Sequence, residues 1–248
     1  MITWIQGKII EKKQWCEALF SLTIKTNEPL KFKAGQFILI GLNDGDTITY
    51  RPYSLINVPE DTLVEVHFNT VKDGTLSPRL ADLKPGDAIQ VSNRPSGLLT
   101  LDETPNAANL WLFATGTGIG PFISILKTAE PWQRFEKVVL CYAVKTLEGM
   151  AYSADFKALV KRYPKQFHFV PFVTREHVAD TFNSRITHHI DNGKLEDYVG
   201  VNLSPESSHV MLCGNANMIN DMTTLLEHKG LRRHSRHEPG HIAIEKYY

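Results

Sequence analysis

Up to about residue 100, short hydrophobic runs alternate with turn residues. The runs are rich in β-branched and aromatic side chains and cover residues 3–10, 18–26, 35–42, 53–58, 63–71 and 87–91. Glycine, proline, asparagine and aspartate separate them, as in 43–46 and 84–87, which have the chemistry of tight turns. This pattern predicts an antiparallel β-barrel or sandwich, with one short helix over 76–83.

In the rest of the chain, apolar strands alternate with segments of helical periodicity. Strands are predicted over 109–115, 137–143, 167–174 and 209–214, and helices over 121–129, 153–163 and 217–229. The apolar face of the last helix comprises Met218, Ile219, Met222, Leu225 and Leu226, and Gly230 can end it. Alternation of this kind predicts a parallel sheet with helices on both faces.

A polar stretch with one proline, 101–106, separates the two patterns. We therefore expect a β-barrel domain over 1–100 followed by an α/β domain over 101–248. The 248 residues, 42% of them hydrophobic, are enough to bury two cores. Because 27 Lys and Arg balance 27 Asp and Glu, no overall field favours a nucleic acid or a membrane surface, and a charged partner must meet a local patch.

The three cysteines, Cys16, Cys141 and Cys213, lie far apart and form no CxxC pair. This spacing argues against a disulfide framework and against an iron–sulfur cluster, and reduced thiols fit a cytoplasm best. The N-terminus lacks the pattern of a signal peptide, and no apolar run approaches the roughly 20 residues that span a bilayer. We expect a soluble, unprocessed, cytoplasmic protein.

Two motifs in the first part have the chemistry of a flavin dinucleotide site. In 51–54 (RPYS), predicted at the start of a strand, the arginine can hold a pyrophosphate, the tyrosine can lie against a flavin, and the serine can hydrogen-bond its reactive nitrogen. The segment 73–80 places a glycine, hydroxyl groups and free backbone N–H groups at a helix start, where anions bind. The alternatives are an edge arginine with a packed tyrosine, and an ordinary helix with Ser77 as N-cap and Pro78 in first position.

A glycine-rich turn, 114–121 (ATGTGIGP), joins a predicted strand to a predicted helix. Its glycines let backbone N–H groups approach a pyrophosphate, and the helix dipole favours the negative charge. The G-x-G-x-G spacing is tighter than that of the usual dinucleotide fingerprint. We expect no metal site, because Pro239 and Gly240 break the helix that would align His237 with His241. The G-x-S-x-G motif of a serine hydrolase is absent from the sequence.

Five segments in order resemble the bacterial ferredoxin/flavodoxin–NADP(+) reductase family. They are 51–54 (RPYS), 74–80 (GTLSPRL), 114–126 (ATGTGIGPFISIL), 210–219 (VMLCGNANMI) and 244–248 (IEKYY). The resemblance spans nearly the whole chain and implies a FAD-binding barrel, an NADP-binding domain and a catalytic cleft between them. The implied activity is electron transfer between NADPH and ferredoxin or flavodoxin through FAD, as hydride transfer to flavin N5 followed by single-electron steps.

The resemblance also implies which residues hold FAD. They are Arg51, Pro52, Tyr53, Ser54, His67, Thr75, Leu76, Ser77, Thr117, Tyr247 and Tyr248. Tyr53 would lie against one face of the isoalloxazine, with Ser54 near N5 and Tyr247 on the face that nicotinamide must reach. Tyr248 would cover the adenine, and His67 stands where close relatives have an aromatic residue.

For NADP the resemblance implies a second set in the α/β part. It comprises Thr117, Gly118, Val144, Lys145, Thr174, Arg175, Arg185, Cys213, Gly214, Asn215 and Asp221. Two guanidinium groups, of Arg175 and Arg185, would neutralise the 2′-phosphate, and Lys145 would add a point charge. The implied catalytic residues are Ser54, Cys213, Glu245 and Tyr247. Among them Cys213 would place the nicotinamide, and Glu245 would assist proton supply or partner coupling.

One basic cluster stands out in an otherwise neutral chain: Lys229, Arg232, Arg233 and Arg236. It is either a solvated face or a docking site for an acidic ferredoxin or flavodoxin. We expect such a carrier as partner, no nucleic acid or membrane partner, and a monomer. Two other functions stay open: an NAD(P)H-dependent flavin or quinone reductase, and an electron-transfer subunit of a larger complex.

Overall fold

The computed structural model describes residues 2–247, without the side chain of Tyr247. The chain divides into two units, and the first runs to Thr100 and also includes 120–128. The second comprises 101–119 and the residues from Ala129 onward. The helix α2 (Gly120–Lys127) therefore belongs to the first unit, where its Ser124 hydroxyl donates to the carbonyl of Asn57 at 2.6 Å.

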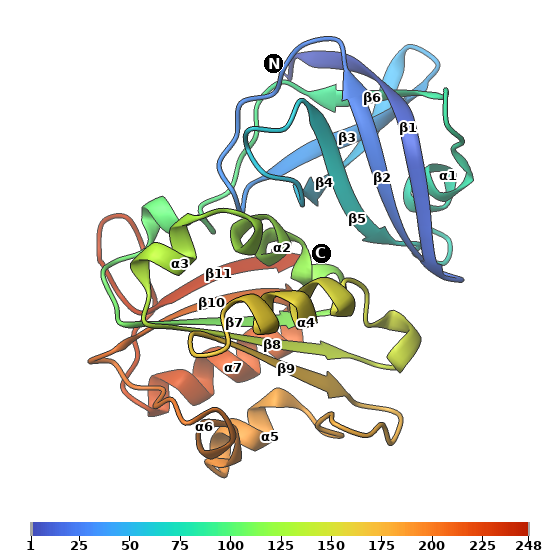
Figure 1. The fold of residues 1–248 in the computed structure, drawn as a ribbon. Helices are drawn as coiled ribbons and strands as arrows, with labels where there is room; N and C mark the ends of the chain where they lie inside the picture. The colour runs from blue at the N-terminus through green and yellow to red at the C-terminus, as the bar shows by residue number, and fades with distance from the viewer. Residues whose placement is uncertain (1, 248) are drawn as a thin grey trace. The chain divides into compact units, whose positions relative to one another are not determined.

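The first unit is a six-stranded antiparallel sheet with the strand order β4-β3-β6-β1-β2-β5 (Figure 1). Its elements are β1 (Trp4–Cys16), β2 (Leu19–Thr26), β3 (Phe37–Asp44), β4 (Thr47–Ser54), β5 (Leu63–Asn69), α1 (Ser77–Asp82) and β6 (Ala88–Ser92). Alternate side chains of the strands form one apolar core that includes Leu22, Ile38 and Val66. The antiparallel architecture predicted from the sequence is confirmed.

Two local predictions in this unit are wrong. The strand predicted over 53–58 is β4, which ends at Ser54, so 51–54 lie at the end of a strand and not at its start. Only Ser54 of β4 is buried, so the strand has no clear hydrophobic pattern in the sequence. Ser77 is the first residue of α1 and not its N-cap; its hydroxyl accepts a hydrogen bond from the N–H of Val71 at 2.9 Å, and Pro78 follows in the second helical position.

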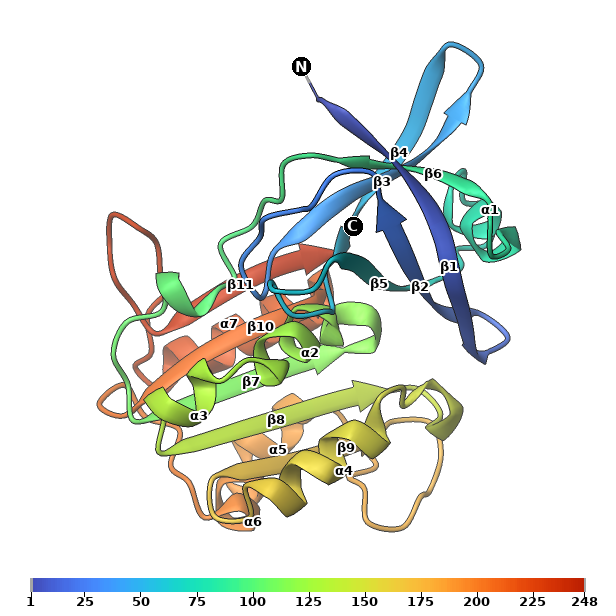
Figure 2. The same cartoon turned by 45° about the horizontal axis from the view of Figure 1, so that its top comes forward.

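The second unit is a five-stranded parallel sheet in the order β11-β10-β7-β8-β9. The strands are β7 (Asn109–Thr115), β8 (Lys137–Val144), β9 (Phe167–Val173), β10 (Ser208–Asn215) and β11 (Ile242–Tyr247). The helices are α3 (Glu130–Arg134), α4 (Ser153–Arg162), α5 (Ile186–Asp191), α6 (Lys194–Val199) and α7 (Ala216–His228), with short 3₁₀ turns at 101–103, 116–119 and 147–149. Figure 2 shows α4 on one face of the sheet and α5 and α7 on the other. This confirms the parallel sheet with helices on both faces.

Burial on both faces explains the nearly continuous apolar sequence of the strands, as in β8, where every residue from Val138 to Val144 is buried. Ile219, Met222 and Leu226 of α7 are buried in the same core, with Met218 and Leu225 packed against it, as predicted. The strand β11 was not predicted, because three apolar residues at a chain end give a weak pattern; it pairs in parallel with β10. No helix within residues 2–247 is both long and apolar enough to cross a membrane.

Candidate functional site

The end of β4 and the loop before α1 meet in the first unit. The Arg51 guanidinium lies 3.5 Å from the Thr75 hydroxyl and donates to the carbonyl of Tyr50 at 2.7 Å. Arg51 and Thr75 are both exposed, while Leu76 and Ser77, which follow Thr75, are buried. The Ser77 hydroxyl holds the loop in place through its bond from Val71. A cation and a hydroxyl thus share an accessible surface that suits a phosphate.

Tyr53 and Ser54 occupy a less exposed place next to this surface. The Tyr53 ring stands edge-on to Phe68, with 5.8 Å between the ring centroids. Burial raises the pKa of Tyr53 to about 12, against the opposing effect of Arg51, so the phenol stays neutral. Ser54 is 2% exposed, and Gly120 of α2 packs on it so closely that a Cβ there would lie 2.9 Å from the Ser54 Cβ. The sequence did not indicate that Gly120 supports Ser54, because Gly120 belongs to the glycine-rich turn that was predicted to approach the pyrophosphate.

His67 lies within the wall of the first unit. Its side chain is 4% exposed, and its Nδ1 lies 3.0 Å from the Ser21 hydroxyl on the neighbouring strand. The ring is also edge-on to Trp15. Burial lowers the pKa of His67 to about 4, so it is neutral at neutral pH. These contacts account for His67 structurally, and its contact with FAD stays a prediction, as does that of the exposed Pro52.

In the second unit, β7 and β10 are neighbours although β8 and β9 lie between them in the chain. Such a reversal of strand order creates a crevice at the carboxyl ends of the strands, where dinucleotides bind in open α/β sheets. The glycine turn follows β7, and Gly214 and Asn215 end β10. Two of the predicted nucleotide motifs therefore flank this switch point.

The two strand ends are in close contact. A Cβ on Gly118 would lie 2.3 Å from the carbonyl oxygen of Cys213, and one on Gly214 would lie 2.1 Å from the Thr115 hydroxyl. The same hydroxyl accepts hydrogen bonds of 3.3 Å from the backbone and side-chain N–H groups of Asn215. Thr115 was missed as a site residue; its position as the last residue of a strand before a glycine turn was the available signal.

The residues predicted to be catalytic in this unit lie on adjacent strands. Cys213 is fully buried on β10 and is in register with Ala114 on β7 and Glu245 on β11. Asn215 is in register with Tyr247. The Tyr247 side chain and Tyr248 lie outside the described residues. Within residues 2–247, no group of three or more His, Cys, Asp and Glu side chains could hold a metal ion.

The predicted 2′-phosphate residues follow the next strands of the sheet. The loops after β8 and β9 are joined, since Thr174 donates to the carbonyl of Val144 at 3.2 Å and the Arg175 N–H donates to that of Lys145 at 2.9 Å. The side chains of Lys145 and Arg175 are exposed. Arg185 is 82% exposed and lies 3.7 Å from Asp221 of α7. The contact of Asp221 with NADP stays a prediction, and Thr117 lies half-exposed in the glycine turn.

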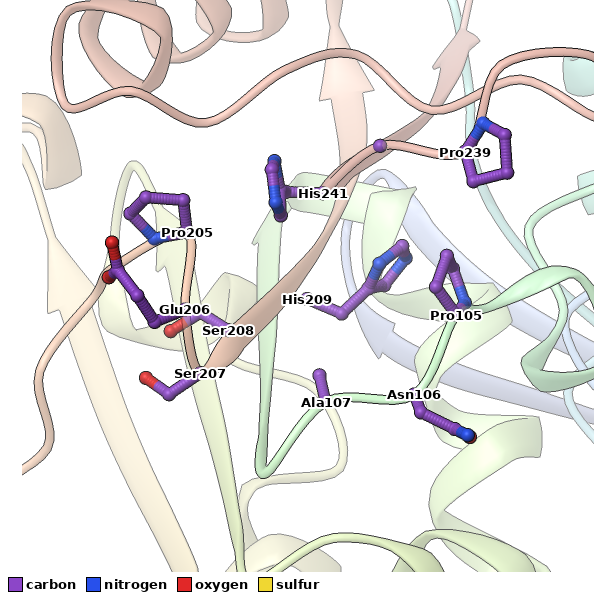
Figure 3. A pocket seen from close by; sticks show the side chains of 11 residues that line it. Pro105, Asn106, Ala107, Pro205, Glu206, Ser207, Ser208, His209, Pro239 and His241 are labelled. Atoms are coloured by element: carbon purple, nitrogen blue, oxygen red, sulfur yellow. The ribbon is translucent and has the colours of Figure 1, made fainter.

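A cavity of about 140 Å³ lies at the opposite end of the same sheet (Figure 3). It is lined by 105–107, 205–209 and 239–241, which lie before or at the start of β7, β10 and β11. Because dinucleotides bind beyond the carboxyl ends of the strands, this cavity is not the nucleotide site. Its most buried polar side chain is that of His209, which is 1% exposed.

His209 makes the stability of the protein sensitive to acid. Burial, assisted by His234, Arg134 and His241, lowers its pKa from 6.5 to about 3. Above the pKa of 6.5 that His209 has in the unfolded state, this histidine is neutral in both the folded and the unfolded protein, and its full contribution to stability is present. As the pH falls from that value toward the folded pKa, only the unfolded state takes up the proton, and the free energy of unfolding decreases by roughly 1.4 kcal/mol per pH unit.

The measurement is urea unfolding at several pH values between about 7.5 and about 5. We expect His209→Asn to lose less stability over this range than the parent protein. His228→Asn, which changes an exposed histidine, is the control and should keep the parental slope. A parental slope in His209→Asn would contradict the assignment.

Comparison with known proteins gives concordant results for both parts of the chain. Residues 6–99 match the model of an oxidoreductase FAD-binding domain, and residues 112–224 match that of an oxidoreductase NAD-binding domain. The flavodoxin/ferredoxin–NADP reductase of Escherichia coli is 41% identical over 250 residues, covering 100% of both chains. The ferredoxin–NADP reductase of Pseudomonas aeruginosa is 33% identical, covering 97% of this chain and 96% of its own.

A similar structure has also been solved. It is a ferredoxin NADP+ reductase from Neisseria gonorrhoeae with bound FAD and NADP, with a TM-score of 0.93, 31% identity and 98% of each chain covered. A flavohemoglobin from Malassezia yamatoensis, with a TM-score of 0.79 and 20% identity, shares the fold over 99% of this chain and 60% of its own.

Proposed function

The chain belongs to the flavodoxin/ferredoxin–NADP reductase family, and from this premise we propose how its own residues carry the reaction. The protein is a flavoenzyme that transfers electrons between NADPH and ferredoxin or flavodoxin through FAD. The observation that carries this conclusion is 41% identity over the full length, across one FAD-binding and one NAD-binding domain. Bound FAD supplies the chemistry, since it takes up two electrons with a hydride and releases them one at a time. The experiment that tests it is anaerobic reduction by NADPH followed by addition of the carrier.

FAD fits the exposed surface at the end of β4. Arg51 and Thr75 bind its pyrophosphate, with Ser77 completing the loop that carries Thr75. The Tyr53 ring supports the isoalloxazine, and its raised pKa keeps it uncharged there. Ser54, against which Gly120 packs, would lie near N5 of the flavin and could hydrogen-bond to it. The spacing of 3.5 Å between Arg51 and Thr75 supports this assignment, because both groups can contact one phosphate.

NADPH fits the carboxyl ends of the strands in the second unit. Gly118 lies so close to the carbonyl of Cys213 that no side chain fits at this position of the switch point. The backbone N–H groups of the glycine turn can therefore be approached closely, which favours the binding of a pyrophosphate there. Arg175 and Arg185 bind the 2′-phosphate, and Lys145 adds a third positive charge. The family resemblance assigns to Cys213, which is fully buried at the end of β10, a part in placing the nicotinamide. The register of Glu245 beside Cys213 supports a role for its carboxylate in proton supply or partner coupling.

Tyr247 would cover the flavin face that the nicotinamide uses, and Tyr248 would cover the adenine of FAD; the Tyr247 side chain and Tyr248 lie outside the described residues. Both assignments rest on the family resemblance.

A cytoplasmic location and a monomeric state also stay predictions.

Ion pairs with neighbouring carboxylates reduce the number of residues of the basic cluster that are available to dock the carrier. Lys229 lies 2.8 Å from Glu196, and Arg236 binds both carboxylate oxygens of Glu103 at 2.6 and 2.9 Å. Paired cations contribute less to the field that a partner meets. The exposed Arg232 and Arg233 therefore carry the proposed docking of an acidic carrier; among the described residues, their one ion pair is a 3.9 Å contact between Arg232 and Glu238.

We expect Arg232→Glu/Arg233→Glu to reduce ferredoxin or flavodoxin about tenfold more slowly at low salt, because charge complementarity sets the encounter rate. The reduction of a small dye by NADPH should not change. Lys157→Glu/Lys161→Glu is the matched control, since it reverses two exposed charges on α4. Stopped-flow kinetics at two salt concentrations measure the difference, and an undiminished rate with the carrier would refute the docking assignment.

A further inference from the structure

Ser184 and His189 form a hydrogen-bonded pair next to Arg185. The Ser184 Oγ lies 2.7 Å from Nε2 of His189. The His189 side chain is 9% exposed and packs against Phe182 and Phe172, with centroid distances of 4.3 and 5.7 Å. Arg185 lies between the two partners in sequence, as the residue that precedes α5. The pair therefore fixes the short segment that carries Arg185.

The surroundings of His189 determine which ring nitrogen carries its hydrogen. Burial lowers the pKa of His189, and His188 and Lys194 lower it further, so the ring is neutral at neutral pH. Its Nδ1 is buried and has no hydrogen-bond partner among residues 2–247. A hydrogen on Nδ1 would be a buried donor without an acceptor, which is costlier than an unused lone pair. The hydrogen therefore lies on Nε2, and His189 donates to Ser184.

This donation determines what the Ser184 hydroxyl can do. Its oxygen accepts from His189, so its own hydrogen must point elsewhere. In the described part of the chain, the Ser184 oxygen makes no other hydrogen bond that would use this hydrogen. Ser184 is half-exposed, and the neighbouring Arg185 guanidinium is open to solvent. The segment thus presents one oriented O–H donor on the residue that directly precedes an exposed guanidinium.

We propose that Ser184, oriented by His189, donates a hydrogen bond to the 2′-phosphate of NADPH and is a specificity-determining residue for NADPH over NADH. A phosphate dianion has only acceptor oxygens, so it can use the hydroxyl and the guanidinium together. His189 is a positioning residue, since it acts on the phosphate only through Ser184. The inference rests on the proposed role of Arg185 in binding this phosphate.

The test compares Ser184→Ala, His189→Leu and the double variant. We expect each single variant to lower kcat/KM for NADPH about tenfold, through KM more than kcat, because a charge-assisted hydrogen bond is lost. The values for NADH should not change. The double variant should equal Ser184→Ala, because His189 has no effect once the hydroxyl is gone. His189→Gln, which retains an N–H donor, should restore most of the NADPH activity.

Binding of adenosine 2′,5′-bisphosphate, measured by calorimetry, gives a readout independent of turnover. Its affinity should fall about tenfold in both single variants, while that of adenosine 5′-phosphate stays constant. An unchanged Ser184→Ala variant, or equal losses for NADPH and NADH in His189→Leu, would overturn the inference. Arg185→Ala separates the two levels: if it lowers the NADPH preference and Ser184→Ala does not, only this inference fails. If Arg185→Ala leaves the preference intact, the proposed role of Arg185 fails.

Discussion

Replacing Gly118 by alanine is expected to lower kcat/KM for NADPH by about 100-fold while the protein retains FAD. The new Cβ would lie 2.3 Å from the carbonyl oxygen of Cys213 and 2.9 Å from the Cα of Gly214. Both are backbone atoms, so one of the two strand ends must move by a large fraction of an ångström. Displacements of that size in groups that position a substrate are sufficient for the loss. FAD should stay bound because its proposed contacts lie mostly in the first unit.

The measurement is steady-state reduction of a dye by NADPH, together with the flavin content and the melting temperature. Gly149→Ala is the matched control, because its Cβ would meet only Val144, at 3.7 Å and beyond, which is ordinary contact. We expect this variant to have parental kinetics. Full activity in Gly118→Ala would show that the contact between the two strand ends does not position NADPH.

The double substitution Arg175→Ala/Arg185→Ala is expected to abolish the preference for NADPH. Both guanidinium groups are exposed, and Arg185 has only a long, solvent-exposed contact with Asp221, so both can be used for an anion. Each charge-assisted contact with a phosphate contributes roughly 1.5–3 kcal/mol, and the loss of both should lower kcat/KM for NADPH by at least about 100-fold. NADH has no 2′-phosphate, so its kcat/KM should stay the same.

Parallel kinetics with NADPH and NADH measure this effect. Arg162→Ala removes an exposed arginine from α4 and serves as the control for the loss of positive charge. An equal decrease with both nucleotides would mean that the two arginines act on the structure or on the shared part of the cofactor. In that case the 2′-phosphate would bind elsewhere.

The elements with a strong local signal were predictable. The strand β7 has the predicted bounds because its apolar run is closed by polar residues on one side and by glycines on the other. By contrast, β4 was placed too late because its polar, exposed residues form a strand only through pairing with β3. The strand β11 depends in the same way on β10, and a pattern confined to one segment does not contain that pairing.

The same distinction applies to the site. Arg51, Ser77 and the glycine turn were identifiable because each belongs to a contiguous motif. The hydroxyl of Thr115, the packing of Gly120 on Ser54 and the bond between Ser184 and His189 were not identified, because each depends on contacts that the fold creates. Ser77 shows that a motif does not determine the role of each of its residues. The sequence predicts that Ser77 caps α1, but because α1 begins at Ser77, its hydroxyl instead holds the preceding loop.

The central claim is that electrons pass from NADPH through FAD to a one-electron carrier. The most direct test is anaerobic titration of the purified protein with NADPH and, separately, with NADH, followed by addition of oxidised ferredoxin or flavodoxin. The account predicts a yellow protein whose extracted cofactor is FAD, whose flavin absorbance is bleached much faster by NADPH than by NADH, and whose absorbance recovers as the carrier becomes reduced. A protein without FAD, or a flavin that NADPH reduces but that neither carrier reoxidises, would contradict it.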